Sequence, residues 1–538
     1  MMQRRGFLKI AGRLGAGIGV AGPLFGQLAG AGQAHTDTAR PRELIQALDK
    51  GWSIATDSNN VGREQSWFQE ARSNAKATPV PSIIQELYPA YHGVAWYWVD
   101  FKANTNPFAK GRTLLRFHAV DYLADVWLNG HHVGSHEGGE TPFVLDVTDI
   151  VHPNQSNKLA VRVLNPDDRS IDGIVLKETP HRNKVVKFSN GSLYDFGGIL
   201  QPVELAYVPA VRISNLHIVP DWKTGDVAIR ITVQNALFKS VRATLRLLVS
   251  QDAGQTVLQD TLKNPIAAGE SQVSHQITLK QFRLWDLDTP NLYQLQMTLD
   301  SADTDGSFAI ADTFGFRDFR LVNGYFRLNG RRLFLRCTHT GNHVPFRQVI
   351  PPEGYEDMLR RDLLYAKASG LNTVRFISGV AYPYQLDLCD ELGLMVYQES
   401  SASWLLKDSP RMKTLYETSV REMIERDRNH PSLTIWGMLN ETEDGPVSRE
   451  AQAALPFGKD SRRFKAVALF QRTLRRTSRY RLSEQPEDKR VGARVGKGST
   501  RGKPRCHDFT FRTRHRRFSS LPEGSPDAGN ESHDAHSG

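Results

Sequence analysis

The chain has 538 residues, a length at which three or four domains are expected rather than one small module. Hydrophobic residues make up 40% of the chain and charged residues 23%, which excludes a protein that is disordered throughout. The net charge of +10 arises in residues 461–538, which carry 19 Lys and Arg against 8 Asp and Glu, so the remainder is close to neutral. The body of the chain therefore favours neither a nucleic-acid partner nor a membrane surface.

The first 34 residues have the pattern of an export signal. Arg4 and Arg5 precede a weakly apolar run rich in Gly and Ala, which ends in small residues suited to signal peptidase. The alternative is a membrane anchor, but the many glycines make the run too polar and too poor a helix former. We expect export by the twin-arginine route to the periplasm or the cell exterior, with no stable membrane insertion.

From about residue 90 to 320, short alternating segments are separated by turn residues, a pattern typical of β-sandwiches. The clearest hairpin is predicted around Asn129-Gly130, because both central positions of a type I′ turn need a positive φ. Two β domains are predicted, over residues 35–209 and 210–319.

After Asn329-Gly330 the period changes, and strands alternate with helices. Strands are predicted at 333–337, 372–377, 394–398 and 433–439, and helices at 354–369, 384–391 and 411–428. This alternation indicates βα units around a parallel sheet, over residues 320–460.

Several motifs resemble glycoside hydrolase family 2. The resemblance to its sugar-binding domain lies in residues 93–98 (GVAWYW), 126–143 (including HEGG) and 198–203 (GILQPV). Its passage into the catalytic barrel is resembled by residues 314–317 (FGFR) and 326–330 (FRLNG), and its acid/base strand by 429–432 (NHPS), 435–436 (IW) and 440–441 (NE). The last group is the most specific.

The resemblance implies a jelly-roll-like sandwich, an immunoglobulin-like sandwich and the first half of a (β/α)8 TIM barrel. It also implies a hydrolase that cleaves terminal β-linked sugars by a retaining mechanism, with a carbohydrate as its partner. We expect no cofactor. No metal site is expected either, because the histidines, carboxylates and three cysteines show no ligand spacing.

Within this resemblance Glu441 is the general acid/base, since barrel enzymes build their sites at the carboxyl ends of the strands. Asn440 is expected to bind the sugar 2-hydroxyl, a contact that strengthens in the transition state. The alternative makes Asn440 a helix N-cap, with Glu441 in the first helical turn.

Four further residues are candidates for substrate binding. Arg375 and Glu399 end predicted strands, where they either line the pocket or form a structural ion pair. His343 lies where the family has a histidine loop, and an ordinary loop histidine is the alternative. Trp404 is a candidate for stacking on a sugar ring, or else a buried aromatic. Residues 380–383 (VAYP) replace the Ser-His-Tyr-Pro of many galactosidase-like members, which argues against a standard β-galactosidase pocket.

The family pattern stops near Asp460. A complete barrel needs about 250 residues, and no later glutamate has the setting of a nucleophile, so none is assigned. Residues 461–538 are rich in Arg and poor in hydrophobic residues. A basic low-order tail is expected here, read as a shifted reading frame rather than a basic arm for polyanions. The missing nucleophile leaves an alternative function, a non-catalytic carbohydrate-binding protein that uses the first sandwich.

Overall fold

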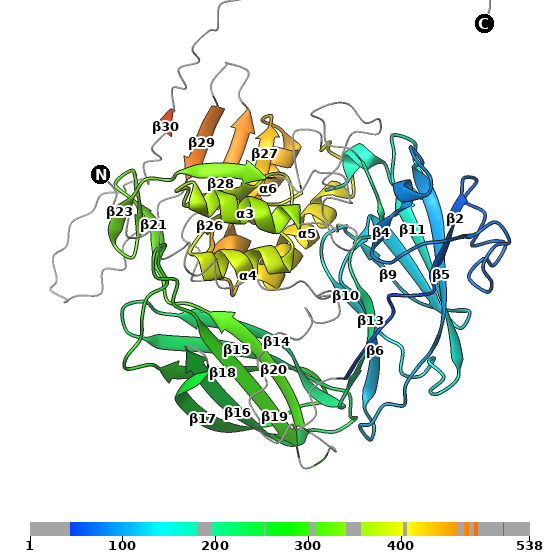
Figure 1. Ribbon diagram of the computed structural model, residues 1–538, viewed down its shortest axis with the longest axis horizontal. Coiled ribbons are helices and arrows are strands. Elements are labelled where there is room, and N and C mark those ends of the chain that lie inside the picture. Colours follow the sequence, from blue (N-terminus) through cyan, green and yellow to red (C-terminus); the bar gives the residue numbers. More distant parts are fainter. Residues whose placement is uncertain are drawn as a thin grey trace, which may run out of the picture.

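The computed structural model describes residues 44–180, 195–251, 254–301, 303, 307–340, 357–401 and 406–460, together with strands at 467–472, 478–482 and 509–510. The expected signal segment lies outside these residues. Three units follow one another along the chain: two β-sandwiches and a β/α unit (Figure 1). Among the described residues, no helix has the length and apolar character needed to cross a bilayer.

The first sandwich consists of three sheets. Four strands form one sheet in the order β1 (Leu44–Ala47), β13 (Val203–Val208), β6 (Arg112–Phe117) and β10 (Phe143–Asp146). Six form the second, in the order β3 (Lys76–Ala77), β2 (Ser53–Asp57), β5 (Gly93–Lys102), β11 (Ser156–Asn165), β8 (Leu123–Leu128) and β9 (His131–Glu137). The third is β4 (Ser82–Ile83), β12 (Gly198–Ile199) and β7 (Val120–Asp121). Two 3-10 turns lie at Ile84–Glu86 and Leu176–Glu178.

The predicted hairpin is confirmed. β8 and β9 pair antiparallel on either side of Asn129 and Gly130, whose φ angles are 52° and 82°. Both angles lie in the region that a type I′ turn requires. The Asn129 side chain adds a brace, because its amide nitrogen donates to Asn157 Oδ1 at 2.9 Å.

The second sandwich has seven strands in two sheets. One sheet has the order β14 (Val211–Pro220), β15 (Asp226–Asn235) and β18 (Gly269–Thr278). The other has the order β17 (Gln255–Ile266), β16 (Val241–Gln251), β19 (Tyr293–Ser301) and β20 (Ser307–Phe314). Buried and more exposed residues alternate along β15 and β16, as expected when one face of each sheet meets a shared core. The buried set includes Ile229, Leu245 and Met297.

The third unit begins with a small sheet and continues as a parallel one. The small sheet is β21 (Phe319–Val322), β22 (Tyr325–Leu328) and β23 (Arg331–Leu333). The large sheet has the order β24 (Cys337–Thr340), β25 (Thr373–Phe376), β26 (Met395–Glu399), β27 (Leu433–Thr442), β28 (Val467–Arg472), β29 (Ser478–Leu482) and β30 (Phe509–Thr510). Pairing is parallel from β24 to β28 and antiparallel beyond.

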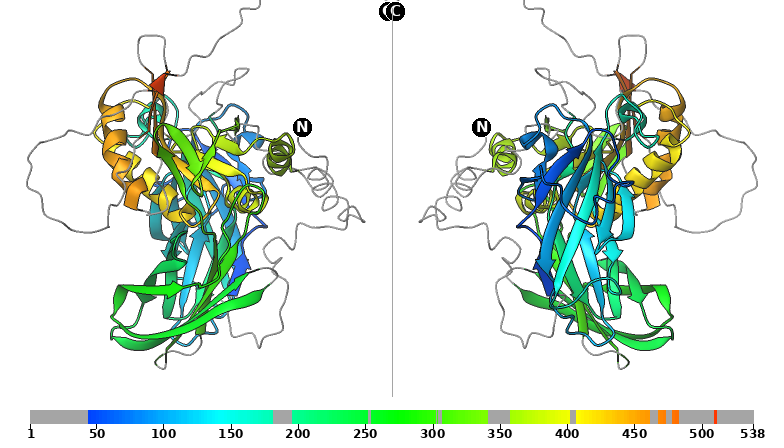
Figure 2. Two further views of the ribbon diagram at one scale, coloured as in Figure 1. Left: turned by 90° about the vertical axis from the view of Figure 1, so that its left-hand side faces the viewer. Right: turned by 90° about the vertical axis from the view of Figure 1, so that its right-hand side faces the viewer.

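Four helices connect these strands, namely α3 (Met358–Ala368), α4 (Pro383–Leu392), α5 (Met412–Asp427) and α6 (Pro446–Asp460). In the views of Figure 2 these helices lie above the second sandwich. Asp357 caps α3 by accepting hydrogen bonds from the backbone N–H groups of Leu359 and Arg360. The alternation of strand and helix agrees with the first half of a barrel.

Two details of the predicted pattern were wrong. The strand expected at 333–337 falls between β23 and β24, because Arg331–Leu333 pairs with β22 and the parallel sheet starts only at Cys337. The parallel sheet was also expected to end before residue 460, yet β28 pairs with β27 beyond it. The apolar run Val467-Ala468-Leu469-Phe470 is short enough to be missed among the surrounding arginines.

The second sandwich is joined to the β/α unit through the buried Arg317. Its Nε donates to the carbonyl of Pro431 at 2.6 Å, and an Nη donates to the carbonyl of Leu433. Burial lowers the pKa of Arg317 to about 10, while Asp318 and Asp390 act in the opposite direction. Gly315 allows this close approach, since a Cβ there would lie 3.0 Å from Trp285 and 3.1 Å from Pro431.

The NHPS motif supplies the other side of the same junction. Asn429 accepts from the N–H of Ile218 at 3.0 Å and donates to the carbonyl of Leu216 at 2.8 Å. His430 Nδ1 lies 2.7 Å from Asp390 Oδ2, and the N–H of Ser432 donates to Asp390 Oδ1 at 2.8 Å. The motif therefore fixes the start of β27 against the second sandwich.

Replacing Arg317 with Met is expected to lower the free energy of unfolding by about 2–4 kcal/mol, because two buried carbonyls lose their donors. Denaturant unfolding followed by tryptophan fluorescence measures this. Arg246→Met is the control, since Arg246 is 49% exposed and pairs with Asp300 at the surface, where an ion pair contributes about 1 kcal/mol or less. Equal losses in the two variants would contradict the assigned role.

His430 should make stability depend on alkaline pH. Burial alone would lower its pKa, but Asp390, Asp427 and Asp387 raise it to about 9. Because the pKa is higher in the folded state, the contribution is complete below about pH 6.5 and is lost as pH rises through 9. We expect the wild type to lose about 3 kcal/mol more than His430→Gln between pH 6.5 and 9.5. Parallel stability profiles would contradict this.

Candidate active site

The carboxyl ends of three neighbouring parallel strands bring four of the predicted residues together. Arg375 lies in β25, Glu399 ends β26, and Asn440 and Glu441 lie at the end of β27. The strands are adjacent and parallel, so their carboxyl ends share one edge of the sheet. This edge is the candidate active site.

Arg375 connects the other groups. Its Nε donates to Glu399 Oε1 at 2.7 Å, with a second contact from an Nη to the same oxygen. Another hydrogen bond of 2.8 Å runs from this Nη to Asn440 Oδ1. The guanidinium also lies over the Tyr397 ring, 5.1 Å from its centroid. Because its oxygen is occupied, Asn440 keeps its amide nitrogen as the donor for a ligand.

Glu399 is a structural partner of Arg375 rather than an exposed ligand. It is completely buried, and its Oε2 accepts from the N–H of Ser378 at 2.8 Å. Burial raises its pKa, and the Arg375 charge opposes that effect. Gly437 makes room for it, since a Cβ there would lie 2.4 Å from Glu399 Cγ. With an oxygen on each of two donors, Glu399 is not available to attack a substrate.

Glu441 differs from these neighbours because its side chain is exposed. It borders a cavity of about 250 Å³, together with residues of the segment 442–447 and with Leu406 and Asp408. Its φ is +51°, a left-handed conformation that is uncommon for a residue with a side chain and that is often found at functional sites. The alternative of a helix N-cap at Asn440 was wrong, because β27 continues to Thr442 and α6 begins at Pro446.

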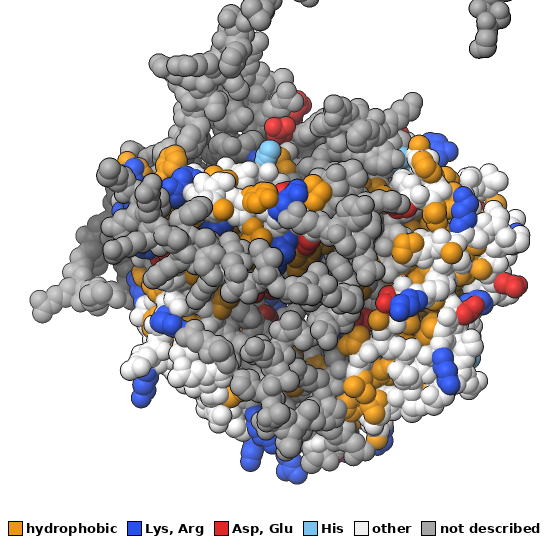
Figure 3. All heavy atoms as spheres, viewed as in Figure 1, with side chains coloured by type: hydrophobic (Ala, Val, Ile, Leu, Met, Phe, Trp, Pro, Cys, Tyr) orange, Lys and Arg blue, Asp and Glu red, His pale blue; other side chains and the backbone are white. Residues whose placement is uncertain are grey.

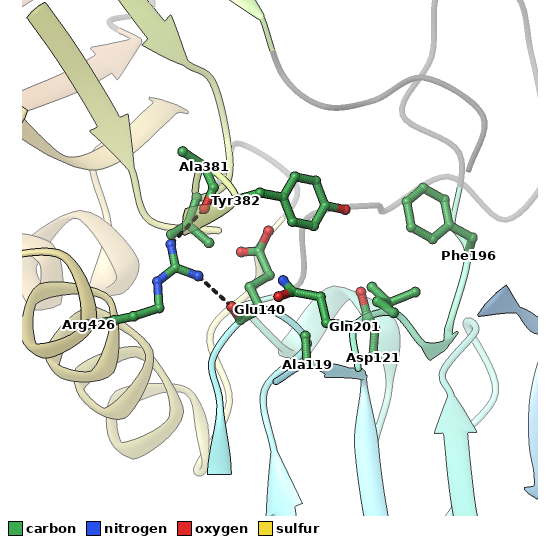
Figure 4. Close-up of a pocket in the computed structure, with 11 residues that line it drawn as sticks. Ala119, Asp121, Glu140, Phe196, Gln201, Ala381, Tyr382 and Arg426 are labelled. Carbon is green, nitrogen blue, oxygen red and sulfur yellow. Dashed lines mark hydrogen bonds between the residues drawn. The ribbon is translucent and has the colours of Figure 1, made fainter. Parts of the chain in front are cut away.

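A second, narrow cleft lies between the first sandwich and the β/α unit (Figure 4). The sandwich contributes Asp121, Glu140 and Gln201, and the loop after β25 contributes Ala381 and Tyr382. The small side chains of Val380 and Ala381 border this cleft, whose free volume is only about 10 Å³. Sequence reasoning missed this cleft, although Glu140 directly follows the HEGG motif; contacts between domains leave no periodic signal.

Arg426 of α5 holds the two walls of this cleft together. It donates to the carbonyl of Glu140 at 2.9 Å and to the carbonyl of Ala381 at 2.7 Å. Its Nε donates to the buried Asp427 at 2.7 Å. Nearby, Thr141 donates to Glu422 at 2.6 Å. The first sandwich is therefore fixed beside the carboxyl edge of the sheet.

The remaining candidates are not located. His343 and Trp404 lie outside the described residues. Among the described residues, one group of possible metal ligands comes together, Asp387, Asp390 and His430. In this group His430 Nδ1 lies 2.7 Å from Asp390 Oδ2, and Asp390 Oδ1 accepts from the N–H of Ser432 at 2.8 Å, so its ligand atoms are paired with one another and with the backbone.

Three family models match consecutive parts of the chain. They are the sugar-binding domain of glycosyl hydrolases family 2 over residues 45–209, a second domain of this family over 211–317, and its TIM barrel domain over 319–474. The jelly-roll-like, immunoglobulin-like and half-barrel architecture is confirmed. The barrel match runs past residue 460, in agreement with strand β28.

Individual proteins are similar over most of the chain. A β-galactosidase of Pectobacterium atrosepticum is 25% identical over 461 residues, which are 79% of this chain and 42% of that protein. A β-glucuronidase of Bacteroides uniformis has a TM-score of 0.66 at 23% identity, covering 80% of this chain and 52% of that one. A putative β-galactosidase of Bacteroides fragilis gives 0.66 at 20%, covering 80% and 64%.

The chain therefore spans about half the length of the relatives that it matches. At these low sequence identities, the similarity to the solved structures shows a shared fold. Together, the three consecutive domain matches, the order of the units and the Asn440-Glu441 pair at the end of β27 show that this chain belongs to glycoside hydrolase family 2.

Proposed function

We propose that this chain carries the acid/base half of a site that hydrolyses terminal β-linked sugars. The observation that carries the proposal is the contrast at the end of β27. Asn440 is buried and held by Arg375, whereas the adjacent Glu441 is open to a cavity. A rigid amide that can bind the sugar, beside an accessible carboxyl group, supplies one side of such a site, which also needs a second carboxylate.

In the proposed retaining mechanism, Glu441 first protonates the leaving oxygen while a nucleophilic carboxylate attacks the anomeric carbon. It then deprotonates the water that hydrolyses the glycosyl-enzyme intermediate. The Asn440 amide nitrogen donates to the sugar 2-hydroxyl. Glu399 acts through Arg375, which orients Asn440. No nucleophile is assigned among the described residues.

A second candidate is a carbohydrate-binding protein without turnover. It is favoured by Glu399, which shares the sheet edge with Glu441 but has its oxygens on Arg375 and Ser378. The two candidates differ in one outcome. Sugar binding with hydrolysis supports the first, and sugar binding without any hydrolysis supports the second.

Changing Glu441 to Gln is expected to lower the turnover of aryl β-glycosides by about 10²–10⁴-fold, because the water that hydrolyses the glycosyl-enzyme intermediate loses its general base. The measurement is release of nitrophenol by the purified full chain. Glu391→Gln serves as control, because this exposed carboxylate of α4 lies outside the site. Undiminished turnover in Glu441→Gln would remove Glu441 from the mechanism.

Changing Asn440 to Ala should affect substrates according to their 2-hydroxyl group. We expect kcat/KM for an aryl β-glycoside to fall about 100-fold, whereas kcat/KM for the matching 2-deoxy glycoside changes little. The comparison separates loss of the sugar contact from general damage to the site. Equal losses for both substrates would contradict the assigned contact.

A further inference from the structure

We infer that the cavity at Glu441 selects uncharged terminal sugars and disfavours uronic acids. This inference rests on the proposed function and adds the class of sugar to it. It concerns the charge that the described walls of the site present to a ligand.

The first observation is the charge of the cavity itself. Besides Glu441, the side chains that border it include the carboxylates of Asp408, Glu443 and Asp444, all of them exposed. The other lining residues are uncharged: Leu406, Thr442, Gly445, Pro446 and Val447. The exposed Lys407, between Leu406 and Asp408 in the chain, supplies one positive charge against these four carboxylates. Clefts that carry charges of one sign attract or repel charged ligands over several ångströms. A uronate entering this cavity meets like charges.

The second observation is the state of the arginines described at this end of the sheet, one of which, Arg411, pairs with Glu137 of the first sandwich. Arginine is the usual partner of a ligand carboxylate, because its planar group donates two parallel hydrogen bonds. Arg375 instead donates to Glu399 and Asn440. Arg426 donates to Asp427 and to two backbone carbonyls. These three guanidinium groups are thus engaged within the protein.

The narrow cleft beside the first sandwich is also lined by negative charges. Its lining contains the carboxylates of Asp121 and Glu140, while the Arg426 charge is balanced by Asp427. Glu140 reaches Ser401, which follows β26 by two residues, so this cleft borders the same edge of the sheet. The described surfaces around the site therefore repel a ligand carboxylate from two sides. Elsewhere on the face shown in Figure 3, acidic and basic side chains are interspersed.

The test compares sugars that differ only at C6. Three matched pairs of nitrophenyl β-glycosides are used: glucoside and glucuronide, galactoside and galacturonide, mannoside and mannuronide. The full chain is assayed at 20 mM and 500 mM NaCl. The measured quantity is kcat/KM where hydrolysis occurs, and the Kd from calorimetry where it does not.

At 20 mM NaCl the neutral member of the preferred pair should be favoured at least about 10-fold. This ratio should shrink at least about 3-fold at 500 mM NaCl, since salt screens exposed charges. It should shrink similarly in the double variant Asp408→Asn, Asp444→Asn. The control is Asp149→Asn, Asp303→Asn, which removes two exposed carboxylates of the sandwiches and should leave the ratio unchanged.

A uronate that binds or reacts as well as its neutral partner would overturn the inference and leave the proposed function standing. So would a neutral preference that neither salt nor the double variant reduces, since the cause would not be charge. If no member of any pair binds or reacts, the proposed function fails together with the inference. The salt series needs no variant, so the test holds even if the double variant does not fold.

Discussion

The position of the candidate acid/base depends on one buried guanidinium. Arg317 leaves the second sandwich and donates to the carbonyls of Pro431 and Leu433, the second of which is the first residue of β27. Since Asn440 and Glu441 lie near the other end of β27, the site is placed by a contact at the opposite end of the same strand. The family motifs FGFR and NHPS are therefore two halves of a single junction, although more than a hundred residues separate them.

At the carboxyl edge of the sheet, some residues are held rigidly in place and their neighbour Glu441 is accessible to solvent. Arg375, Glu399 and Asn440 form a buried, mutually bonded group, in which each charge has its partner. Such a group costs desolvation, which its internal hydrogen bonds offset. Glu441 stands outside it and faces solvent. The rigid group supplies geometry, and the exposed carboxyl group remains free to exchange a proton.

Sequence reasoning located the parallel strands and their carboxyl-end residues, because buried strands with short apolar runs leave a clear pattern. It identified the Asn440-Glu441 pair correctly at the end of a strand, yet it could not choose between a ligand and an ion pair for Arg375 and Glu399. That choice depends on how deeply the side chains are buried and on which side chain lies opposite them. The sequence of a single strand contains neither piece of information. The cleft at Glu140 was missed for a related reason, since its walls come from separate domains. Residues 1–43, His343 and Trp404 stay predictions.

The glycine beneath the ion pair constrains how this site can change. Gly437 faces Glu399 across the pair of strands so closely that any side chain would overlap its Cγ. A mutation at 437 therefore expels Glu399, which releases Arg375 and then Asn440. A shorter residue at 399 would relieve only part of the overlap, because the same Cβ would also lie 2.5 Å from the ring of Tyr397. Positions 397, 399 and 437 are thus expected to change together, and relatives with a side chain at 437 must hold the asparagine at the end of this strand by other means.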